Sequence, residues 1–285
     1  MSKLKIAIQK SGRLSESSRK LFEECGIKIS NGAGTLKIVA SNFPIEILFL
    51  RDDDIPQYVE QGVADIGIVG ENMVFEKNKE ADILEQLGFA GCRLSLAIAK
   101  EENYSGHGFF MNKRVATSYP RLLGEYLASN NITATVEEIS GSVEIAPGVG
   151  LADAICDIVS SGSTLLMNGL KEVETIMKSQ AVIIANRNIL PDKKLILEKL
   201  LFRIRAVKNA RENKYILLNA PREAIAEICQ ILPGMKSPTI LPLADEGWCS
   251  LHSVVKEDEF WERIDQLKNA GAEGILVIPI EKMVL

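Results

Sequence analysis

Short apolar runs and amphipathic stretches alternate along the first two thirds of the chain. Apolar and β-branched runs predict strands at residues 5–9, 36–40, 45–50 and 65–70. Amphipathic stretches predict helices at 15–25 and 55–61, which Gly26 and Gly62 end. Strands that alternate with helices in this way predict a mostly parallel sheet in an α/β fold.

A second series of elements follows the first. Strands are predicted at 92–100, 114–117, 133–139 and 181–185, and helical stretches at 121–130 and 165–178. We expect two α/β domains from this pattern. Residues 1–92 together with 181–207 form the first domain, because the chain returns to it, and residues 93–180 form the second.

The last part of the chain follows a pattern of its own. Strands are predicted at 215–218, 239–243, 248–255 and 274–280, and helices at 222–232 and 258–270. The order βαββαβ is that of a ferredoxin-like domain, which we place at residues 208–285. It carries no evident catalytic cluster. We therefore expect it to bind an effector, to mediate assembly or to serve as a structural cap.

Composition and charge exclude several classes of protein. The net charge of −5 leaves no basic surface for nucleic acid, so a phosphate substrate must meet local cations and backbone amides. The N-terminal apolar run of three residues is too short for a signal peptide. No apolar run approaches the ~18 residues of a membrane span. We therefore expect a cytoplasmic protein that binds neither nucleic acid nor membrane.

Cysteine and histidine chemistry is not indicated either. The five cysteines include no C-x-x-C pair, which argues against a zinc site or a disulfide framework. The two histidines, His107 and His252, lie near no nucleophile motif. We expect structural or surface roles for both and no catalytic triad.

The stretch 151–165, LADAICDIVSSGSTL, carries the most specific chemical signal. Asp153 and Asp157 are four residues apart, so they share a face of a helix or an extended turn. Serines and a threonine then surround Gly162, in a turn whose backbone N–H groups can converge on an anion. Mg²⁺ or sugar hydroxyls would offset the repulsion between the carboxylates. The alternative interpretation is a helix cap with a solvated acidic face.

Cations follow two of the predicted strands. Lys10 and Arg13 lie on the turn after the first strand, and Arg51 follows the strand at 45–50. Ligands of α/β proteins bind at the carboxyl ends of parallel strands, so these side chains are candidates for phosphate contacts. A capped turn with two solvated bases is the alternative for Lys10 and Arg13.

Longer motifs, taken in order, carry a family resemblance. They are QKSGRL at 9–14, RDDDIP at 51–56, GENM at 70–73, GCRLSLA at 91–97, ATSYP at 116–120, GSVE at 141–144, GLADAICDIVSSGSTL at 150–165, SPTILPLA at 237–244 and ILVIPIEKM at 275–283. With these motifs the chain resembles the long form of ATP phosphoribosyltransferase, the first enzyme of histidine biosynthesis. The resemblance extends over nearly the whole length.

The resemblance implies a fold, a reaction and an assembly. The fold is a catalytic core of two α/β lobes like a type II periplasmic binding protein, with the active site in the cleft, plus the ferredoxin-like domain as a regulatory histidine-binding domain. The reaction joins N1 of the adenine of ATP to C1 of phosphoribosyl pyrophosphate, releases pyrophosphate and requires Mg²⁺, whose protein ligands stay unassigned. Histidine is the expected feedback inhibitor. The expected assembly is a homo-oligomer, from dimer to hexamer, without a separate regulatory subunit.

The resemblance also implies site residues. Phosphoribosyl pyrophosphate is expected at Asp153, Asp157, Ser160, Ser161, Gly162, Ser163, Thr164 and Leu165, with the two carboxylates on the ribose hydroxyls and the turn on the 5-phosphate. ATP is expected at Lys10, Gly12, Arg13, Leu14, Arg51, Glu71 and Tyr119. The expected catalytic residues are Arg13, Arg51 and Glu71. Histidine is expected at Asn219, Met235, Ser237 and Thr239, where Asn219 replaces an acid found in some members.

Two other functions remain open on the sequence. One is a solute-binding protein of the same two-lobed architecture, which would need export and hence a signal peptide. The other is a phosphate-sensing regulatory protein without catalysis, in which the C-terminal domain is the functional part. Both leave the stretch 151–165 unexplained.

Overall fold

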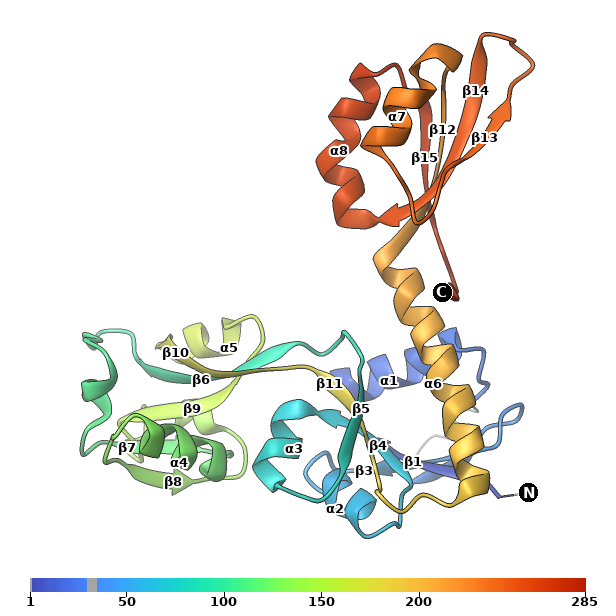
Figure 1. The fold of residues 1–285 in the computed structure, drawn as a ribbon. Helices are drawn as coiled ribbons and strands as arrows, with labels where there is room; N and C mark the ends of the chain where they lie inside the picture. Colours follow the sequence, from blue (N-terminus) through green and yellow to red (C-terminus); the bar gives the residue numbers. More distant parts are fainter. Residues whose placement is uncertain (1, 30–34) are drawn as a thin grey trace. The chain divides into compact units, whose positions relative to one another are not determined.

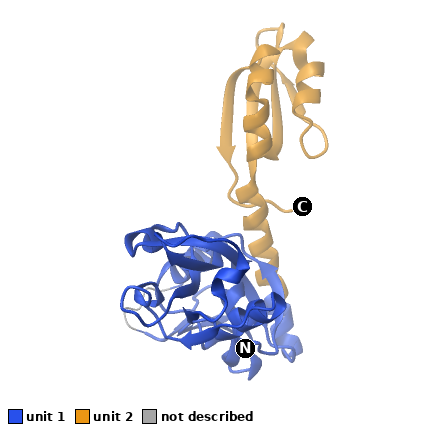
Figure 2. Ribbon diagram, turned by 90° about the vertical axis from the view of Figure 1, so that its left-hand side faces the viewer, with its two compact units in different colours: residues 1–197 blue, residues 198–285 orange. Residues whose placement is uncertain are grey.

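The computed structural model describes residues 2–29 and 35–285. The chain divides into two compact units, residues 1–197 and 198–285, and the division falls within the long helix α6 (Pro191–Glu212) (Figure 2). The regulatory domain that the sequence predicts from residue 208 begins in the same helix. Within the described residues, the N-terminal unit holds two sheets and the C-terminal unit holds one.

The first sheet of the N-terminal unit is the core of lobe I (Figure 1). Its strands are, in spatial order, β2 (Lys37–Val39), β3 (Ile45–Leu50), β1 (Leu4–Gln9), β4 (Ile66–Gly70), β11 (Ala181–Ala185) and β5 (Asp82–Gln86). β1 is parallel to β3 and β4, whereas β11 is antiparallel to β4 and β5. Helices α1 (Arg13–Glu24), α2 (Ile55–Glu60) and α3 (Glu71–Lys77) follow β1, β3 and β4. The central strands are buried almost throughout, which explains their near-continuous apolar runs.

The second sheet is the core of lobe II. Its strands are, in spatial order, β10 (Leu170–Ser179), β6 (Cys92–Ala99), β9 (Ala154–Val159), β7 (Arg114–Thr117) and β8 (Thr135–Glu138). Helix α4 (Pro120–Ser129) connects β7 to β8, and the short helix α5 (Ser163–Met167) follows β9. β9 is parallel to β7 and antiparallel to β6. The carboxyl ends of β7 and β9 therefore lie at one edge of the sheet, where ligand sites of α/β folds occur.

The chain passes between the lobes twice. It leaves lobe I after β5 and enters lobe II at β6, and it returns between β10 and β11 at Gln180. Two lobes joined by two such crossings form the core of the fold class that the sequence predicts, and the structure confirms it. The lobes are further tied by backbone hydrogen bonds at the return, where Gln180 O accepts from Glu71 N at 2.9 Å.

One predicted element is wrong. The stretch 165–178 is a helix only as far as Met167, and Gly169, with φ of +69°, separates it from strand β10. β10 is an edge strand that pairs antiparallel with β6 through two register shifts. Charged side chains are tolerated on such an edge, and Glu172 is paired with Arg93 of β6. The tertiary pairing therefore overrides the helical spacing of the polar residues.

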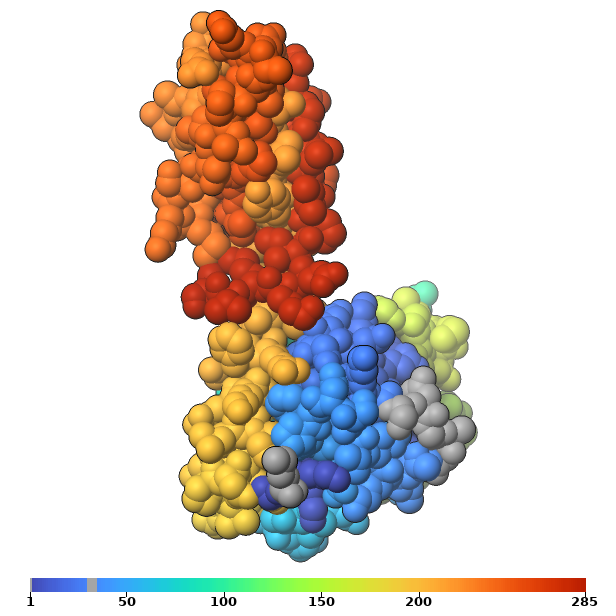
Figure 3. Space-filling model, turned by 90° about the vertical axis from the view of Figure 1, so that its right-hand side faces the viewer, coloured from blue at the N-terminus to red at the C-terminus, as the bar shows by residue number. Residues whose placement is uncertain are grey.

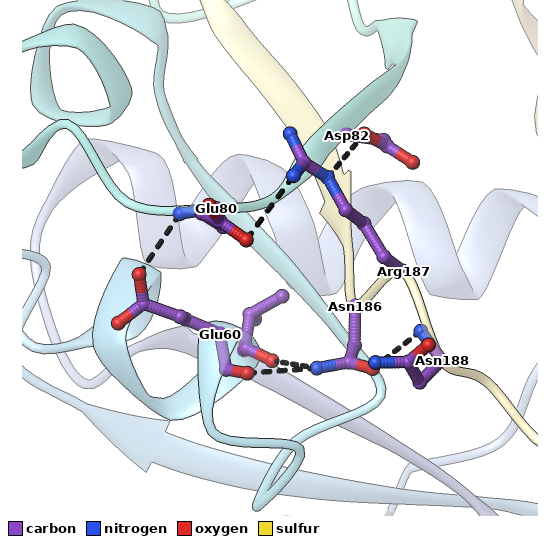
Figure 4. A network of polar contacts seen from close by, with 7 residues as sticks. Glu60, Glu80, Asp82, Asn186, Arg187 and Asn188 are labelled. Carbon is purple, nitrogen blue, oxygen red and sulfur yellow. Dashed lines mark hydrogen bonds and ion pairs between the residues drawn. The ribbon is translucent and has the colours of Figure 1, made fainter.

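A polar network fixes the turn that leads from β11 to α6 (Figure 4). Asn186 Nδ2 donates to the carbonyl oxygens of Val59 and Glu60, at 2.7 and 2.9 Å, and so holds the end of α2. The Arg187 guanidinium bridges the carboxylates of Glu80 and Asp82, each at 3.2 Å. The strand that returns from lobe II is thereby anchored to lobe I.

The C-terminal unit is a βαββαβ domain, as the sequence predicts. Its strands are, in spatial order, β13 (Thr239–Pro242), β14 (Trp248–Lys256), β12 (Asn213–Pro221) and β15 (Glu273–Pro279), all antiparallel. Helices α7 (Ile225–Ile231) and α8 (Glu257–Asn269) complete it. The strand order places the first and third strands at the centre, which is the ferredoxin-like arrangement. The predicted fold class is therefore confirmed for this domain as well.

The two faces of this sheet differ. Ile216 and Leu218 of β12 are fully buried and belong to the core that includes residues of α7 and α8. Tyr215, Leu217 and Asn219 alternate with them and face away from the helices. We call that second side the open face. The C-terminal residues 280–285, dark red in Figure 3, lie beside α6, where Met283 N donates to Ala206 O at 2.8 Å.

Candidate functional site

A cleft of about 590 Å³ lies between the two lobes of the N-terminal unit. Lobe I contributes Gln9, Gly12, Arg13, Leu14, Glu16, Ser17, Asp52, Gly70, Asn72 and Met73. The crossing segment and lobe II contribute Ala90, Gly91, Cys92, Tyr119, Ile158 and Ser160. The cleft thus lies at the carboxyl ends of β1, β4, β7 and β9, where the sequence places the candidate residues.

The wall from lobe I is built on tight backbone turns. Gly12, with φ of +90°, precedes α1, and Arg13 is the first residue of that helix. Gly70 precedes α3, and a Cβ at this position would lie only 2.4 Å from Asn72 Oδ1. Glycine is therefore required where the side chain of Asn72 folds back against the backbone.

On the side of lobe II, the turn 160–164 borders the cleft and Ser160 lines it. Gly162 adopts φ of +81°, a conformation that favours glycine. The hydroxyls of Ser161 and Ser163 are hydrogen-bonded to each other at 2.9 Å, and Ser160, Ser161, Ser163 and Thr164 are exposed. Arg13 reaches across from lobe I, and its Nη1 donates to Ser160 Oγ at 3.3 Å. The structure therefore brings a cation from one lobe to the predicted anion-binding turn of the other.

Asp157 and Asp153 do not lie together as the sequence suggested. Asp153 directly precedes strand β9, and Asp157 lies within it. In an extended strand, a separation of four residues corresponds to ~13 Å. Asp153 lies at the start of β9, where its carboxylate accepts from Arg114 N at 2.8 Å, and this contact lowers its pKa. Asp153 is therefore at the opposite end of β9 from the turn 160–164, and the structure does not bring it to the cleft.

Asp157 is a different kind of carboxylate. Burial raises its pKa to about 6, and the charge of Glu144 acts in the same direction. The backbone N–H of Ile158 donates to Asp157 Oδ1 at 2.7 Å and opposes the shift. A carboxylate in this state gains from a cation or from hydrogen-bond donors, which favour its ionised form.

A buried chain of hydrogen bonds links the two lobes at the wall of the cleft. Ser179 Oγ donates to Asn72 Oδ1 at 2.8 Å, and Asn72 Nδ2 donates to Tyr119 Oη at 3.0 Å. Tyr119 is 8% exposed, and burial together with the charges of Asp157 and Asp52 raises the pKa of its phenol. The neutral hydroxyl of Tyr119 is therefore fixed in the cleft wall.

Helices α3 and α4 make a second contact between the lobes. Glu76 of α3 accepts hydrogen bonds from the backbone N–H groups of Arg121 and Leu122, at 3.1 and 3.0 Å. The Arg121 guanidinium donates in return to the carbonyl oxygen of Phe75. A buried carboxylate of lobe I thus caps a helix of lobe II, and this helix begins directly after Tyr119.

Other predicted residues lie near the cleft without lining it. Arg51 follows β3, but its guanidinium binds the carboxylate of Asp53 at 3.1 and 3.2 Å. Glu71 is half-buried at the start of α3, and Lys10 is exposed after β1. Leu165 is 7% exposed and packs in the core of lobe II beneath the turn. The roles of these four residues stay predictions.

Sequence reasoning missed eleven of the sixteen described residues that line the cleft, among them Asp52, Asn72 and Cys92. Asn72 lies inside the motif GENM, and Asp52 lies inside the motif RDDDIP. The sequence could have indicated both residues, because these motifs also supplied Glu71 and Arg51 as candidates. Cys92 also lines the cleft, and burial raises the pKa of its thiol, so it is poorly reactive.

The C-terminal unit has a pocket of its own, of about 940 Å³. Of the four residues expected to bind histidine, Met235, Ser237 and Thr239 line this pocket and Asn219 does not. Asn219 lies on the same open face, opposite Ser250. His252 was expected to be structural or on the surface, yet it lines this pocket and is hydrogen-bonded to Tyr215 Oη at 2.7 Å.

Among residues 2–29 and 35–285, no group of three or more His, Cys, Asp or Glu side chains is arranged to hold a metal ion. Within the same residues, no helix combines the length and apolarity that crossing a membrane requires.

Family models match the chain in two parts. The model described as ATP phosphoribosyltransferase matches residues 51–206, and the one described as HisG, C-terminal domain matches residues 210–282. A Cytophaga hutchinsonii protein named ATP phosphoribosyltransferase is 62% identical over 281 residues, which cover 99% of this chain and 98% of the relative. This chain belongs to the ATP phosphoribosyltransferase family. The resemblance that the motifs carry is confirmed.

Further members of the ATP phosphoribosyltransferase family agree with this assignment. The protein of that name from Bacteroides thetaiotaomicron is 58% identical over 282 residues, which cover 99% of this chain and 100% of the relative. A solved ATP phosphoribosyl transferase (HisG:HisZ) complex from Thermotoga maritima is 29% identical, with a TM-score of 0.60. That match covers 71% of this chain and 98% of the other.

Proposed function

We propose that this protein joins N1 of the adenine of ATP to C1 of 5-phosphoribosyl 1-pyrophosphate and releases pyrophosphate, as the first step of histidine biosynthesis. The contact between Arg13 and Ser160 carries the proposal, because it unites a cation of lobe I with the predicted phosphate turn of lobe II in one cleft. Full-length identity of 56–62% to proteins named ATP phosphoribosyltransferase supports the same reaction.

The two substrates divide the cleft between them. The turn 160–164 holds the 5-phosphate through its backbone N–H groups and exposed hydroxyls. Asp157 accepts hydrogen bonds from the ribose hydroxyls, which stabilise the ionised carboxylate. ATP lies against Gly12, Arg13, Leu14 and Tyr119 on the other side. Asp153 is left out of this arrangement, because Arg114 occupies its carboxylate at the far end of β9.

Positioning and electrostatics account for the chemistry. The C1–oxygen bond to pyrophosphate breaks as the N1–C1 bond forms, so positive charge develops on the sugar and negative charge on the leaving group. The guanidinium of Arg13 stabilises the negative charge. Adenine N1 carries a free lone pair and attacks without a general base. Orientation of two bound reactants can contribute ~7–11 kcal/mol, which suits a cleft that holds one substrate on each lobe.

Mg²⁺ fits the carboxylates near the cleft. Asp52 lines the cleft, and Asp157 is a half-buried carboxylate without a cation beside it among the described residues. Mg²⁺ in phosphate sites is typically held by one or two carboxylates together with substrate phosphates. Asp52 would therefore hold the metal together with the substrate phosphates, and the bound metal would neutralise charge on the pyrophosphate.

Turnover tests the proposed reaction. Protein mixed with ATP, phosphoribosyl pyrophosphate and Mg²⁺ should release pyrophosphate, and well-folded protein that releases none would remove the proposal. Thr164→Ala should raise the KM for phosphoribosyl pyrophosphate far more than the KM for ATP, because it removes a hydroxyl of the phosphate turn. Ser129→Ala, an exposed hydroxyl at the end of α4, is the control. Equal effects of Thr164→Ala on both KM values would refute the assignment of the turn.

Histidine binds, in this proposal, to the pocket of the C-terminal unit and inhibits the enzyme. Thr239→Arg fills that pocket and should abolish inhibition by histidine while the uninhibited turnover remains within about twofold. Glu262→Arg on the exposed side of α8 introduces the same side chain outside the pocket and should leave inhibition intact. Unchanged inhibition of folded Thr239→Arg protein would place the effector site elsewhere.

The protein is further proposed to act as a homo-oligomer, from dimer to hexamer, without a regulatory subunit. The open face of the C-terminal sheet supports this proposal. Leu241, Leu276 and Ile278 are 48%, 53% and 39% exposed there, and apolar surface of this kind is typical of protein interfaces.

A further inference from the structure

A second pocket, of about 430 Å³, adjoins the cleft at the crossing between the lobes. It shares Gly91, Cys92 and Ser160 with the cleft, so these three residues lie between the two spaces. Its other lining residues are Gly88, Arg93, Lys178, Ser179 and Gln180. None of these residues was assigned to a substrate by the sequence. The volume lies in the range of ~300–1,000 Å³ that small-molecule sites occupy.

Two cations, Arg93 and Lys178, line the pocket. Arg93 of β6 and Lys178 of β10 lie directly opposite each other in the antiparallel register. Like charges at directly opposed positions are unfavourable unless something compensates them. Lys178 is exposed, and no described residue forms a hydrogen bond or an ion pair with its ammonium group. No described residue that lines the pocket is acidic. Glu172 pairs with Arg93, so Lys178 is the cation of this pair that has no acidic partner among the described residues.

Arg93 is held rigidly in place. Its Nε and Nη2 bind the two carboxylate oxygens of Glu172, and Ser95 Oγ donates to the same carboxylate at 2.8 Å. Its Nη1 donates to the carbonyl oxygen of Ser160 at 3.2 Å. Ser160 is thus held by Arg93 through its backbone and by Arg13 through its side chain. The wall between the pocket and the cleft is therefore fixed from both lobes.

We propose that this pocket, between Arg93 and Lys178, binds a polyphosphate, either the triphosphate of ATP or the departing pyrophosphate. The inference rests on the proposed function, which brings several phosphates into a cleft whose turn 160–164 takes only the 5-phosphate. A protein with a net charge of −5 has to meet the remaining phosphates with local cations. Lys178 supplies a free ammonium group, and the remaining N–H groups of Arg93 supply fixed donors.

Calorimetric titrations with ATP, AMP and pyrophosphate test the pocket on the full-length protein. Lys178→Gln should weaken binding by about tenfold, as loss of a hydrogen bond to a charged group does. If the triphosphate occupies the pocket, binding of ATP weakens and binding of AMP does not. If pyrophosphate occupies it, the binding of pyrophosphate weakens and the ratio of ATP to AMP affinity stays constant. Lys178→Arg should restore affinity in either case.

Lys77→Gln is the matched control, because Lys77 is equally exposed and lines neither pocket. Changes of less than about twofold for ATP and pyrophosphate in folded Lys178→Gln protein, or equal losses in Lys77→Gln protein, would overturn the inference. The titrations do not depend on turnover. Wild-type protein that binds these ligands but releases no pyrophosphate would contradict the proposed reaction and leave the pocket intact.

Discussion

The raised pKa of Asp157 makes the stability of the free protein depend on pH. The side chain of Asp157 lies in a strand of lobe II, where burial raises its pKa to about 6 from the ordinary value. In the folded protein the neutral form is therefore favoured relative to the unfolded chain. The resulting stabilisation is fully present below the unfolded pKa of ~3.9 and is lost as the pH rises through about 6. At neutral pH the ionised carboxylate destabilises the free protein.

Asp157→Asn should consequently stabilise the free protein at pH 8 and disable it. The gain in the free energy of unfolding should approach ~3 kcal/mol at pH 8 and vanish near pH 4, because one pKa unit corresponds to ~1.4 kcal/mol. Thermal unfolding of both proteins between pH 4 and pH 8 measures the gain. Turnover should fall, since the amide accepts ribose hydroxyls poorly. A variant with lower stability at pH 8 would contradict the burial argument.

At this scale the sequence predicted part of the site. The turn 160–164, Arg13 and Tyr119 line or border one cleft, because each lies just after the carboxyl end of a strand, where ligand sites of α/β folds occur. Asp153 was not predictable in the same way. Its spacing from Asp157 fits one face of either a helix or a strand, but only a strand separates the two carboxylates by the length of β9.

Helix α4 depends on another element for its first turn. Its backbone N–H groups are capped by Glu76, which α3 supplies from the other lobe. Sequence alone cannot reveal such a cap, because the donor and the acceptor are about 45 residues apart and no capping residue precedes Pro120. Strand β10 was missed for a related reason, since its pairing with β6 and the ion pair of Glu172 decide its conformation.

Glu76→Ala should therefore destabilise the protein by ~2–3 kcal/mol, because two buried N–H groups lose a charged acceptor. Urea unfolding at constant pH measures the change. Glu125→Ala is the control on the same helix, since Glu125 is exposed and pairs only with Arg121; a loss below ~0.5 kcal/mol is expected there. If both variants lost a similar free energy of unfolding, the hydrogen bonds from Glu76 to the start of α4 would not contribute specifically to stability.

For the whole molecule, the spatial order of the strands could be inferred from the sequence only in part. The βαββαβ pattern predicted the topology of the C-terminal domain completely, because alternating apolar positions in β12 and β14 mark its core. The alternation of strands and helices predicted two α/β lobes, and the family motifs supplied their likeness to a type II periplasmic binding protein. The detail of these lobes, with β11 between β4 and β5, depends on pairings between distant segments that no local pattern encodes.

Leu276→Asp should reduce the assembly to smaller species. The variant places a charge on the open face, where Leu276 lies opposite Leu217 and is 53% exposed. Light scattering coupled to size-exclusion chromatography measures the mass. Trp261→Asp, on α8 and 60% exposed, tests the helical side of the same domain. An unchanged mass for Leu276→Asp would exclude the open face as the interface.

The position of β11 has a consequence for synthesis on the ribosome. Among the described strands β5 pairs only with β11, and β11 is made ~100 residues later, which takes ~5–20 s at typical rates of translation. Lobe II, residues 92–179, is complete before then and can fold as an insertion. During that interval β5 and one edge of β4 are open for pairing with other chains. Substitutions that slow elongation between residues 90 and 185 should therefore lower the soluble yield more than those placed after β11.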